Sequence, residues 1–198
     1  LLAGTVATPV GASMNLAAPT IMKHGGDKQK QRFLRPALTG EETWCQLFSE
    51  PSAGSDLAGL GTQAELDGDE WIVTGQKVWN TSAHHADLGL LVARTDWDSP
   101  KHKGLTYFAL PMNQKEVEVR PLMQMNRHTS FNEVFMTEAR IPNDYVIGTP
   151  GEGWAVALTT LAFERGFGSL KKPRYSKQKS RVIDEAKAES EKHIKDNT

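Results

Sequence analysis

A segment rich in serine and glycine offers the clearest material for ligand chemistry. Residues 46–59 read QLFSEPSAGSDLAG and follow a short extended run from Thr43. The hydroxyls of Ser49 and Ser55, together with exposed backbone amides, can donate hydrogen bonds to carbonyl or phosphate oxygens. Glycines let the backbone come close to a ligand without a Cβ in the way. Composition alone favours an ordinary surface loop, because such clusters usually mark turns.

Other segments change this interpretation. GQKVWNTS stands at 75–82, ARIP at 139–142, GEGW at 151–154 and FER at 163–165, with RPL and FNEVF between the first two. In this order, and with SEPSAGSD at 49–56, they resemble the acyl-CoA dehydrogenase family, especially its bacterial members. The resemblance runs from about Ala18 to Arg165. A single glycine-rich loop would be weak evidence, whereas several segments in family order are specific.

The resemblance implies FAD-dependent α,β-dehydrogenation of an acyl-CoA thioester, in which the cofactor carries the difficult step. It places Trp79 beside the flavin and Thr81 near N5, and Ser55 at the FAD pyrophosphate or the pantetheine arm. The ring edge would be met by backbone and hydroxyl groups of residues 46–49. The cofactor-binding residues that we expect are Gln46, Leu47, Phe48, Ser49, Gly54, Ser55, Trp79, Asn80 and Thr81.

Two departures from the family pattern lie close to these residues. Phe48 stands where a smaller aliphatic residue is common, and SAHH at 82–85 replaces a region that usually contains Asn or Ser followed by Gly. Without the family motifs, Trp79 would fit a core aromatic residue and Thr81 an ordinary hydroxyl at a strand end. Finding both two residues apart favours the cofactor interpretation.

Substrate contacts and a catalytic base are also implied by the resemblance. Ser55, His102, Lys103 and Arg165 would contact acyl-CoA, and Glu164 would be the base that removes the α-proton. Many family members place that base elsewhere, so Glu164 can equally pair with a cation or face solvent. The Lys101–Lys103 cluster can likewise be a solvated group of charges.

The residue pattern predicts an α+β fold. Residues 1–42 are expected to be helical, with one helix from a capping Asp27 to about Arg35 closed by Pro36. The resemblance implies that they are the end of the family's N-terminal helical domain. Alternating stretches over 43–150 predict a mainly antiparallel β-barrel or sandwich. Strands are expected at 43–48, 62–66, 70–79, 88–94, 105–110, 117–120 and 132–139. Residues 151–170 are expected to be helical, and the resemblance implies that they are the first helix of the family's C-terminal domain, here truncated. Residues 171–198 would be a charged helical or disordered tail.

Composition limits the partners. The 198 residues are 38% hydrophobic and 24% charged with a net charge of −1, which gives no reason to expect nucleic acid. No apolar run is long enough for a membrane span. The single Cys45 excludes an internal disulfide and fits a reducing compartment, so we expect the cytoplasm. We expect no metal site, because adjacent His84 and His85 would point to opposite faces of a strand.

The resemblance further implies an electron-transfer flavoprotein or another electron acceptor as partner, and a homo-oligomer. The missing family helices suggest an excerpt or a truncated gene product, whose uncovered apolar faces would favour self-association. Two alternatives remain open. One is a non-catalytic flavin-binding or subunit-association remnant, and the other is a flavin monooxygenase or acyl-CoA oxidase of the same fold.

Overall fold

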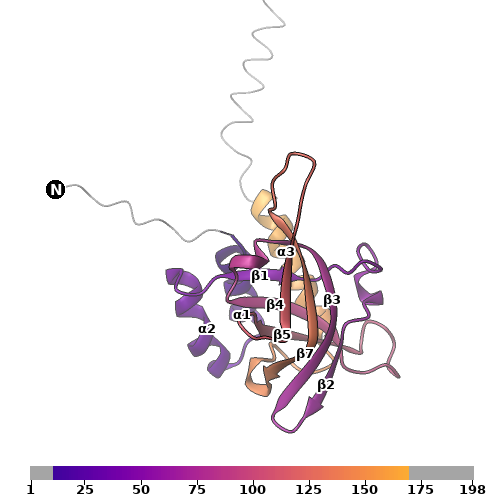
Figure 1. Cartoon of the computed structure of the whole chain (residues 1–198). Coiled ribbons are helices and arrows are strands. Elements are labelled where there is room, and N and C mark those ends of the chain that lie inside the picture. Colours follow the sequence, from indigo (N-terminus) through magenta and orange to yellow (C-terminus); the bar gives the residue numbers. More distant parts are fainter. Residues whose placement is uncertain (1–10, 170–198) are drawn as a thin grey trace, which may run out of the picture. The chain divides into compact units, whose positions relative to one another are not determined.

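The computed structural model describes residues 11–169. It begins with a wide helical turn, η1 (Ser13–Ala17), followed by α1 (Ala18–His24) and α2 (Asp27–Thr39) (Figure 1). The first ten residues of the expected helical domain, and the expected tail at 171–198, lie outside the described residues. No helix in the part that the structure describes is long and apolar enough to cross a membrane.

Helix α2 differs from the expected helix at both ends. Gly26 occupies the N-cap position and Asp27 is the first helical residue, and the helix continues through Pro36 to Thr39. Phe33 and Ala37, four residues apart, are both fully buried. Packing of this face therefore outweighs the single backbone hydrogen bond that Pro36 removes. Gly40 then ends the helix with a φ of 78°.

All the expected strands are present, and they form one seven-stranded sheet. They are β1 (Trp44–Leu47), β2 (Gln63–Asp67), β3 (Glu70–Thr81), β4 (Leu88–Arg94), β5 (Leu105–Pro111), β6 (Val117–Leu122) and β7 (Phe131–Pro142). The strand order is β1-β4-β2-β3-β7-β6, with β5 paired to β4. Short helical turns η2 (Leu57–Gly59), η3 (Ala83–His85) and η4 (Asn143–Tyr145) interrupt the connections.

The sheet is mainly antiparallel, as expected, but two parallel pairings make it a mixed sheet. Strand β1 runs parallel to β4, with Trp44 opposite Leu88, and β2 meets β4 in parallel at Gln63 and Arg94. The other pairings, including the long β3–β7 ladder, are antiparallel. Alternating residue patterns identify strands but carry no direction, so only the path of the long connections decides it.

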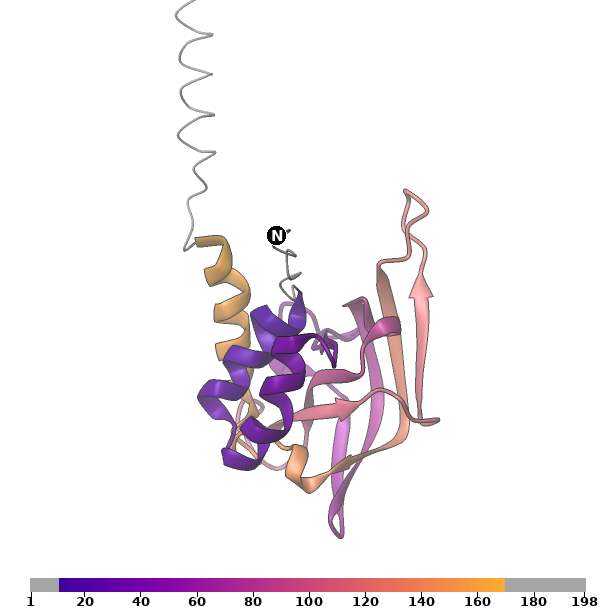
Figure 2. The ribbon, with the colours of Figure 1, turned by 90° about the vertical axis from the view of Figure 1, so that its left-hand side faces the viewer.

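The sheet curls between two cores. Leu90 and Val92 of β4 face the helix-side core, which also holds Phe33, Trp44 and Tyr107. Leu91 and Ala93 face the opposite core together with Trp71 and Phe108. Figure 2 shows α1 and α2 on one side of the sheet. Burial on both faces makes β4 an almost continuous apolar strand rather than an alternating one.

Helix α3 (Gly153–Ser169) begins directly against β5. A Cβ at position 153 would lie 2.5 Å from the carbonyl carbon of Thr106, so only glycine fits this approach. Thr160 of α3 then hydrogen-bonds Thr20 of α1 at 2.9 Å and Tyr107 of β5 at 3.0 Å, all within the buried interior. The compact unit that contains the sheet ends at Phe163.

Phe33 provides a test of the helix-side core. Its ring contacts Trp44 and Tyr145 edge-on, at centroid distances of 5.4 and 4.8 Å. We expect Phe33→Ala to lower the free energy of unfolding by about 3–5 kcal/mol, measured by urea denaturation, because it leaves a cavity. Leu38→Ala on the same helix, at an exposed position, should change it by less than about 0.5 kcal/mol. Equal losses in both variants would contradict this account.

Candidate functional site

A buried ion pair anchors the loop at 49–61, which carries three of the expected ligand contacts, Ser49, Gly54 and Ser55. Lys77 Nζ donates to Glu50 Oε1 at 2.8 Å and to the Phe48 carbonyl at 3.0 Å. The Glu50 carboxylate also accepts the backbone N–H groups of Gly61, at 2.7 Å, and Thr62, at 3.0 Å. The carboxylate therefore joins the beginning of the loop to its end, and Lys77 joins both to β3.

Both charges of this pair are removed from water. Lys77 is fully buried, and burial lowers its pKa to about 8 although the Glu50 charge works to raise it. Burial works to raise the pKa of Glu50, but attraction to Lys77 and the hydrogen bonds outweigh it and hold that pKa below its usual value. Since each ion compensates the other, removing one alone leaves an uncompensated buried charge.

The side-chain amides of Asn80 and Asn132 support the end of β1. Asn80 Nδ2 donates to the Gln46 carbonyl at 2.8 Å, and Asn132 Nδ2 donates to the Asn80 carbonyl at 2.8 Å. Asn132 Oδ1 lies 3.0 Å from His84 Nδ1. Asn80 is thus turned inward and buried, and it holds β1 in place through the Gln46 backbone.

A β-bulge turns Trp79 out of the sheet. The β3–β7 register shifts between Lys77 and Asn80, and Trp79 has a φ of 63°. A bulky residue rarely adopts this conformation, and such strain gathers at functional sites. The Trp79 side chain is 64% exposed, and Phe131 meets it edge-on at 6.2 Å. The bulge therefore presents a flat aromatic surface, with the exposed Thr81 two residues further along.

The remaining expected cofactor residues fall into two groups. The side chains of Leu47 and Phe48 are buried in the two cores, so these residues can reach a ligand only through their backbone. Ser49 is half-buried, and Gly54 and Ser55 are exposed. Gly54 has neither a positive φ nor any atom within 4 Å of the position of a Cβ. Neither its backbone conformation nor its neighbours account for a glycine there.

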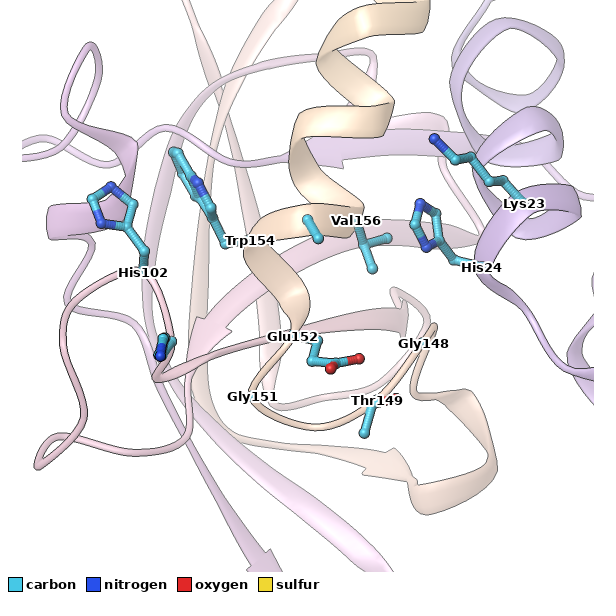
Figure 3. A pocket seen from close by; sticks show the side chains of 11 residues that line it. Lys23, His24, His102, Gly148, Thr149, Gly151, Glu152, Trp154 and Val156 are labelled. Atoms are coloured by element: carbon cyan, nitrogen blue, oxygen red, sulfur yellow. The ribbon is translucent and has the colours of Figure 1, made fainter.

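A cleft of about 650 Å³ lies between α1, the loop at 95–104 and the start of α3. Figure 3 shows His102 beside Trp154 on one side of this cleft and Lys23 and His24 on the other. The His102 and Trp154 rings meet at 4.8 Å. His24 Nε2 lies 2.8 Å from Thr159 Oγ1, and burial together with the Lys23 charge lowers the His24 pKa.

The structure separates the expected substrate residues. His102 and Lys103 line the cleft, whereas Ser55 lies on the other loop. Glu164 and Arg165 are exposed on α3, beyond the compact unit that contains the sheet. The proposed roles of these residues stay predictions.

The histidine pair differs from the expected geometry. His84 and His85 form the turn η3 rather than a strand, and their rings lie 3.9 Å apart. Within residues 11–169, no group of three or more His, Cys, Asp or Glu side chains could hold a metal ion. Cys45 is buried, and burial raises the pKa of its thiol to about 12, which makes it a poor nucleophile.

Sequence reasoning missed several residues that build the site, namely Lys23, His24, Glu50, Lys77 and Asn132. One signal was present for Lys77, because a lysine inside a stretch that forms a strand needs a buried partner if it points inward. Lys23 and His24 stand together in the last turn of α1, before two glycines. Only the tertiary structure brings them opposite His102 and Lys103.

Comparison with known proteins identifies the fold. Residues 45–139 match the family model of the acyl-CoA dehydrogenase middle domain. The chain belongs to the acyl-CoA dehydrogenase family. The acyl-CoA dehydrogenase IpdE1 of Mycobacterium tuberculosis is 44% identical over 173 residues, which cover 87% of this chain and 45% of that protein.

Two further relatives agree. The acyl-CoA dehydrogenase FadE34 of the same organism is 50% identical over 149 residues, covering 75% of this chain and 21% of FadE34. The solved structure of the Tcur3481–Tcur3483 steroid ACAD is 33% identical with a TM-score of 0.74, over 78% of this chain and 40% of that one. The chain thus spans less than half the length of the curated acyl-CoA dehydrogenases named here.

The ion pair gives a stability test within this acyl-CoA dehydrogenase segment. Glu50→Gln and Lys77→Met should each lower the free energy of unfolding by about 3–5 kcal/mol, because each leaves a buried charge uncompensated. The double variant should lose clearly less than the sum of the two, as measured by urea denaturation. The exposed Lys101–Asp56 pair is the control, and Lys101→Met should cost at most about 1 kcal/mol. Additive losses would show that Glu50 and Lys77 act independently.

Proposed function

We propose that this chain binds FAD and an acyl-CoA thioester and serves the α,β-dehydrogenation of the acyl group. The observation that carries the proposal is the strained bulge, which exposes Trp79 and Thr81 next to a loop held by a buried ion pair. The family membership of the chain supports the same conclusion.

The residues present fit an isoalloxazine ring. Such a ring needs a flat apolar surface and hydrogen-bond donors along its edge. The exposed Trp79 ring, which Phe131 contacts edge-on, offers the first. The hydroxyls of Thr81 and Ser49 can donate to ring oxygen and nitrogen atoms. Gly54 fits close passage of the loop backbone along a ligand, since a Cβ there would point into open space. Leu47, Phe48 and Asn80 contribute by fixing the backbone of β1 and β3.

The cleft fits the charged end of an acyl-CoA. Its two lysines, Lys23 and Lys103, can neutralise phosphate groups, although the Glu152 carboxylate also lines the cleft. His24 and His102 can hydrogen-bond to such groups, and Trp154 offers a ring on which a purine can stack. Ser55 would bind the arm that leads from this end toward the flavin. Arg165 completes the proposed substrate contacts.

The chemistry assigned to this chain is proton removal and positioning. Bound FAD would supply the acceptor for the hydride that leaves Cβ of the acyl group. The Glu164 carboxylate would take the α-proton, so that the electrons of the Cα–H bond form the new Cα=Cβ double bond. The thioester carbonyl makes that proton easier to remove, and a general base of this kind typically contributes about 10²–10⁴-fold in rate.

The partners and the location of the protein are part of the same proposal. Electrons would leave through an electron-transfer flavoprotein or another acceptor, and the chain would assemble as a homo-oligomer. Met22 of α1, Leu38 of α2 and Leu158 of α3 are exposed apolar side chains that further helices or a second copy can cover. The single buried Cys45 agrees with the cytoplasm as location.

FAD binding is tested on the full chain by flavin fluorescence quenching. Trp79→Ala and Thr81→Ala should each weaken FAD binding about tenfold, because each removes a ring contact or a hydrogen bond. The matched controls are Leu66→Ala and Thr137→Ala, which are exposed on β2 and β7. Unchanged FAD affinity in both test variants would remove this surface from the site.

Catalysis is tested by anaerobic mixing of FAD-loaded protein with an acyl-CoA. A steroid-derived and a straight-chain acyl group should both be tried, since one similar structure is described as a steroid ACAD. We expect the oxidised-flavin absorbance to disappear, and Glu164→Gln to slow this about 100-fold or more, while the exposed control Glu65→Gln does not.

The same experiment separates the alternatives. Flavin that binds but is never bleached by an acyl-CoA would favour a non-catalytic flavin-binding module. Bleaching followed by rapid reoxidation in air would favour an oxidase. Bleaching at the parent rate in Glu164→Gln would show that Glu164 is not the base.

A further inference from the structure

Arg94, the last residue of β4, carries a buried positive charge that the roles assigned above do not use. Its side chain is almost completely buried, and Trp97 covers the guanidinium at 5.2 Å. Nη2 donates to the Ala58 carbonyl at 2.7 Å and to the Lys101 carbonyl at 3.2 Å, and Nη1 lies 3.5 Å from the Asp96 carbonyl. The hydrogen bonds of this guanidinium therefore go to backbone carbonyls.

Those carbonyls belong to the two loops of the proposed ligand site. Ala58 lies in η2, at the end of the loop that carries Ser55, and Lys101 directly precedes His102 and Lys103. The Arg94 backbone N–H also donates to the Thr62 carbonyl at 2.8 Å, just past the end of the first loop. Arg94 thus forms hydrogen bonds with both loops.

The other polar link between these loops is on the surface. Lys101 Nζ contacts both carboxylate oxygens of Asp56 at 2.8 Å, but both side chains are largely exposed. Exposed pairs of this kind contribute little and are screened by salt. The Arg94 guanidinium is consequently the stronger of the two connections, because its side chain is almost completely buried and its hydrogen bond to the Ala58 carbonyl is shielded from water.

We propose that Arg94 is a positioning residue for the acyl-CoA ligand, which fixes the Ser55 loop relative to the loop of His102 and Lys103. The inference rests on the proposed function, in which these two loops bind different parts of one ligand. A ligand that spans two loops gains affinity when their spacing is set before it binds. Nη2 holds carbonyls of both loops while the planar guanidinium lies against the Trp97 ring and Nη1 reaches the Asp96 carbonyl. The ammonium of lysine is on a shorter side chain and has no planar face, so we expect that it cannot keep all of these contacts.

The test combines two measurements on the full chain carrying Arg94→Lys. Hydrogen exchange at the amides of Gly59, Leu60 and Lys103, which are bonded within the two loops, should become faster in both loops. Coenzyme A itself is the binding probe, and its Kd should rise about tenfold by calorimetry. FAD affinity should fall less than the affinity for coenzyme A, because Trp79 and Thr81 lie on β3 and not on the two loops. Arg140→Lys on β7, which pairs with Glu70 on the surface, is the matched control and should change none of the three quantities.

Two further variants keep the test decisive. Lys101→Ala removes only the surface pair and should leave exchange in both loops unchanged. Trp97→Ala uncovers the guanidinium without removing it, and it should speed exchange in both loops even if Arg94→Lys fails to fold. Faster exchange in only one loop, or an unchanged Kd for coenzyme A in Arg94→Lys, would overturn the proposal.

Failure of the proposed function is distinguishable from failure of the inference. A wild-type chain that bound no coenzyme A would refute the ligand role of both loops. Exchange would then still decide whether Arg94 couples them, because that measurement needs no ligand.

Discussion

The ion pair between Lys77 and Glu50 is the interaction on which the rest of the site depends. A lysine and a glutamate buried side by side are costly to desolvate, and they persist because each satisfies the other and the backbone around it. Here the carboxylate binds the N–H groups at the end of the loop, while the ammonium binds a carbonyl at its beginning. A segment composed of serine, glycine and proline, with little tendency to hold one conformation, thereby acquires a fixed frame.

The same strand that carries Lys77 also produces the aromatic surface. Lys77 points inward to Glu50, and Asn80 points inward to the Gln46 carbonyl. These two inward side chains stand three positions apart in the chain, a spacing that a regular strand with a period of two cannot provide. The extra residue of the bulge resolves this conflict, and its consequence is the exposed Trp79. The anchored loop at 49–61 and the exposed aromatic surface of Trp79 are therefore both linked to one register shift in β3.

Charge and burial divide the site into a rigid part and an adaptable part. The buried groups, Lys77, Asn80 and Arg94, hold backbone carbonyls and set the positions of the loops. The groups that we propose to meet ligands, such as Ser55 and Lys103, are exposed on those loops. Such a division suits a family in which the cofactor performs the difficult chemistry and the protein supplies orientation.

The sequence by itself determined the family, the strands and the helices, because alternating and helical periods, turn residues and ordered motifs are local signals. It also predicted that Trp79 and Thr81 contact the cofactor, which stays a prediction. It could not show that β1 runs parallel to β4, because that direction is set by the path of the chain between the two strands. Nor could it show that Lys77 pairs with Glu50, or that Arg94 forms hydrogen bonds with two loops. These contacts join residues 27 and 36 positions apart, and only burial in the folded chain makes them strong.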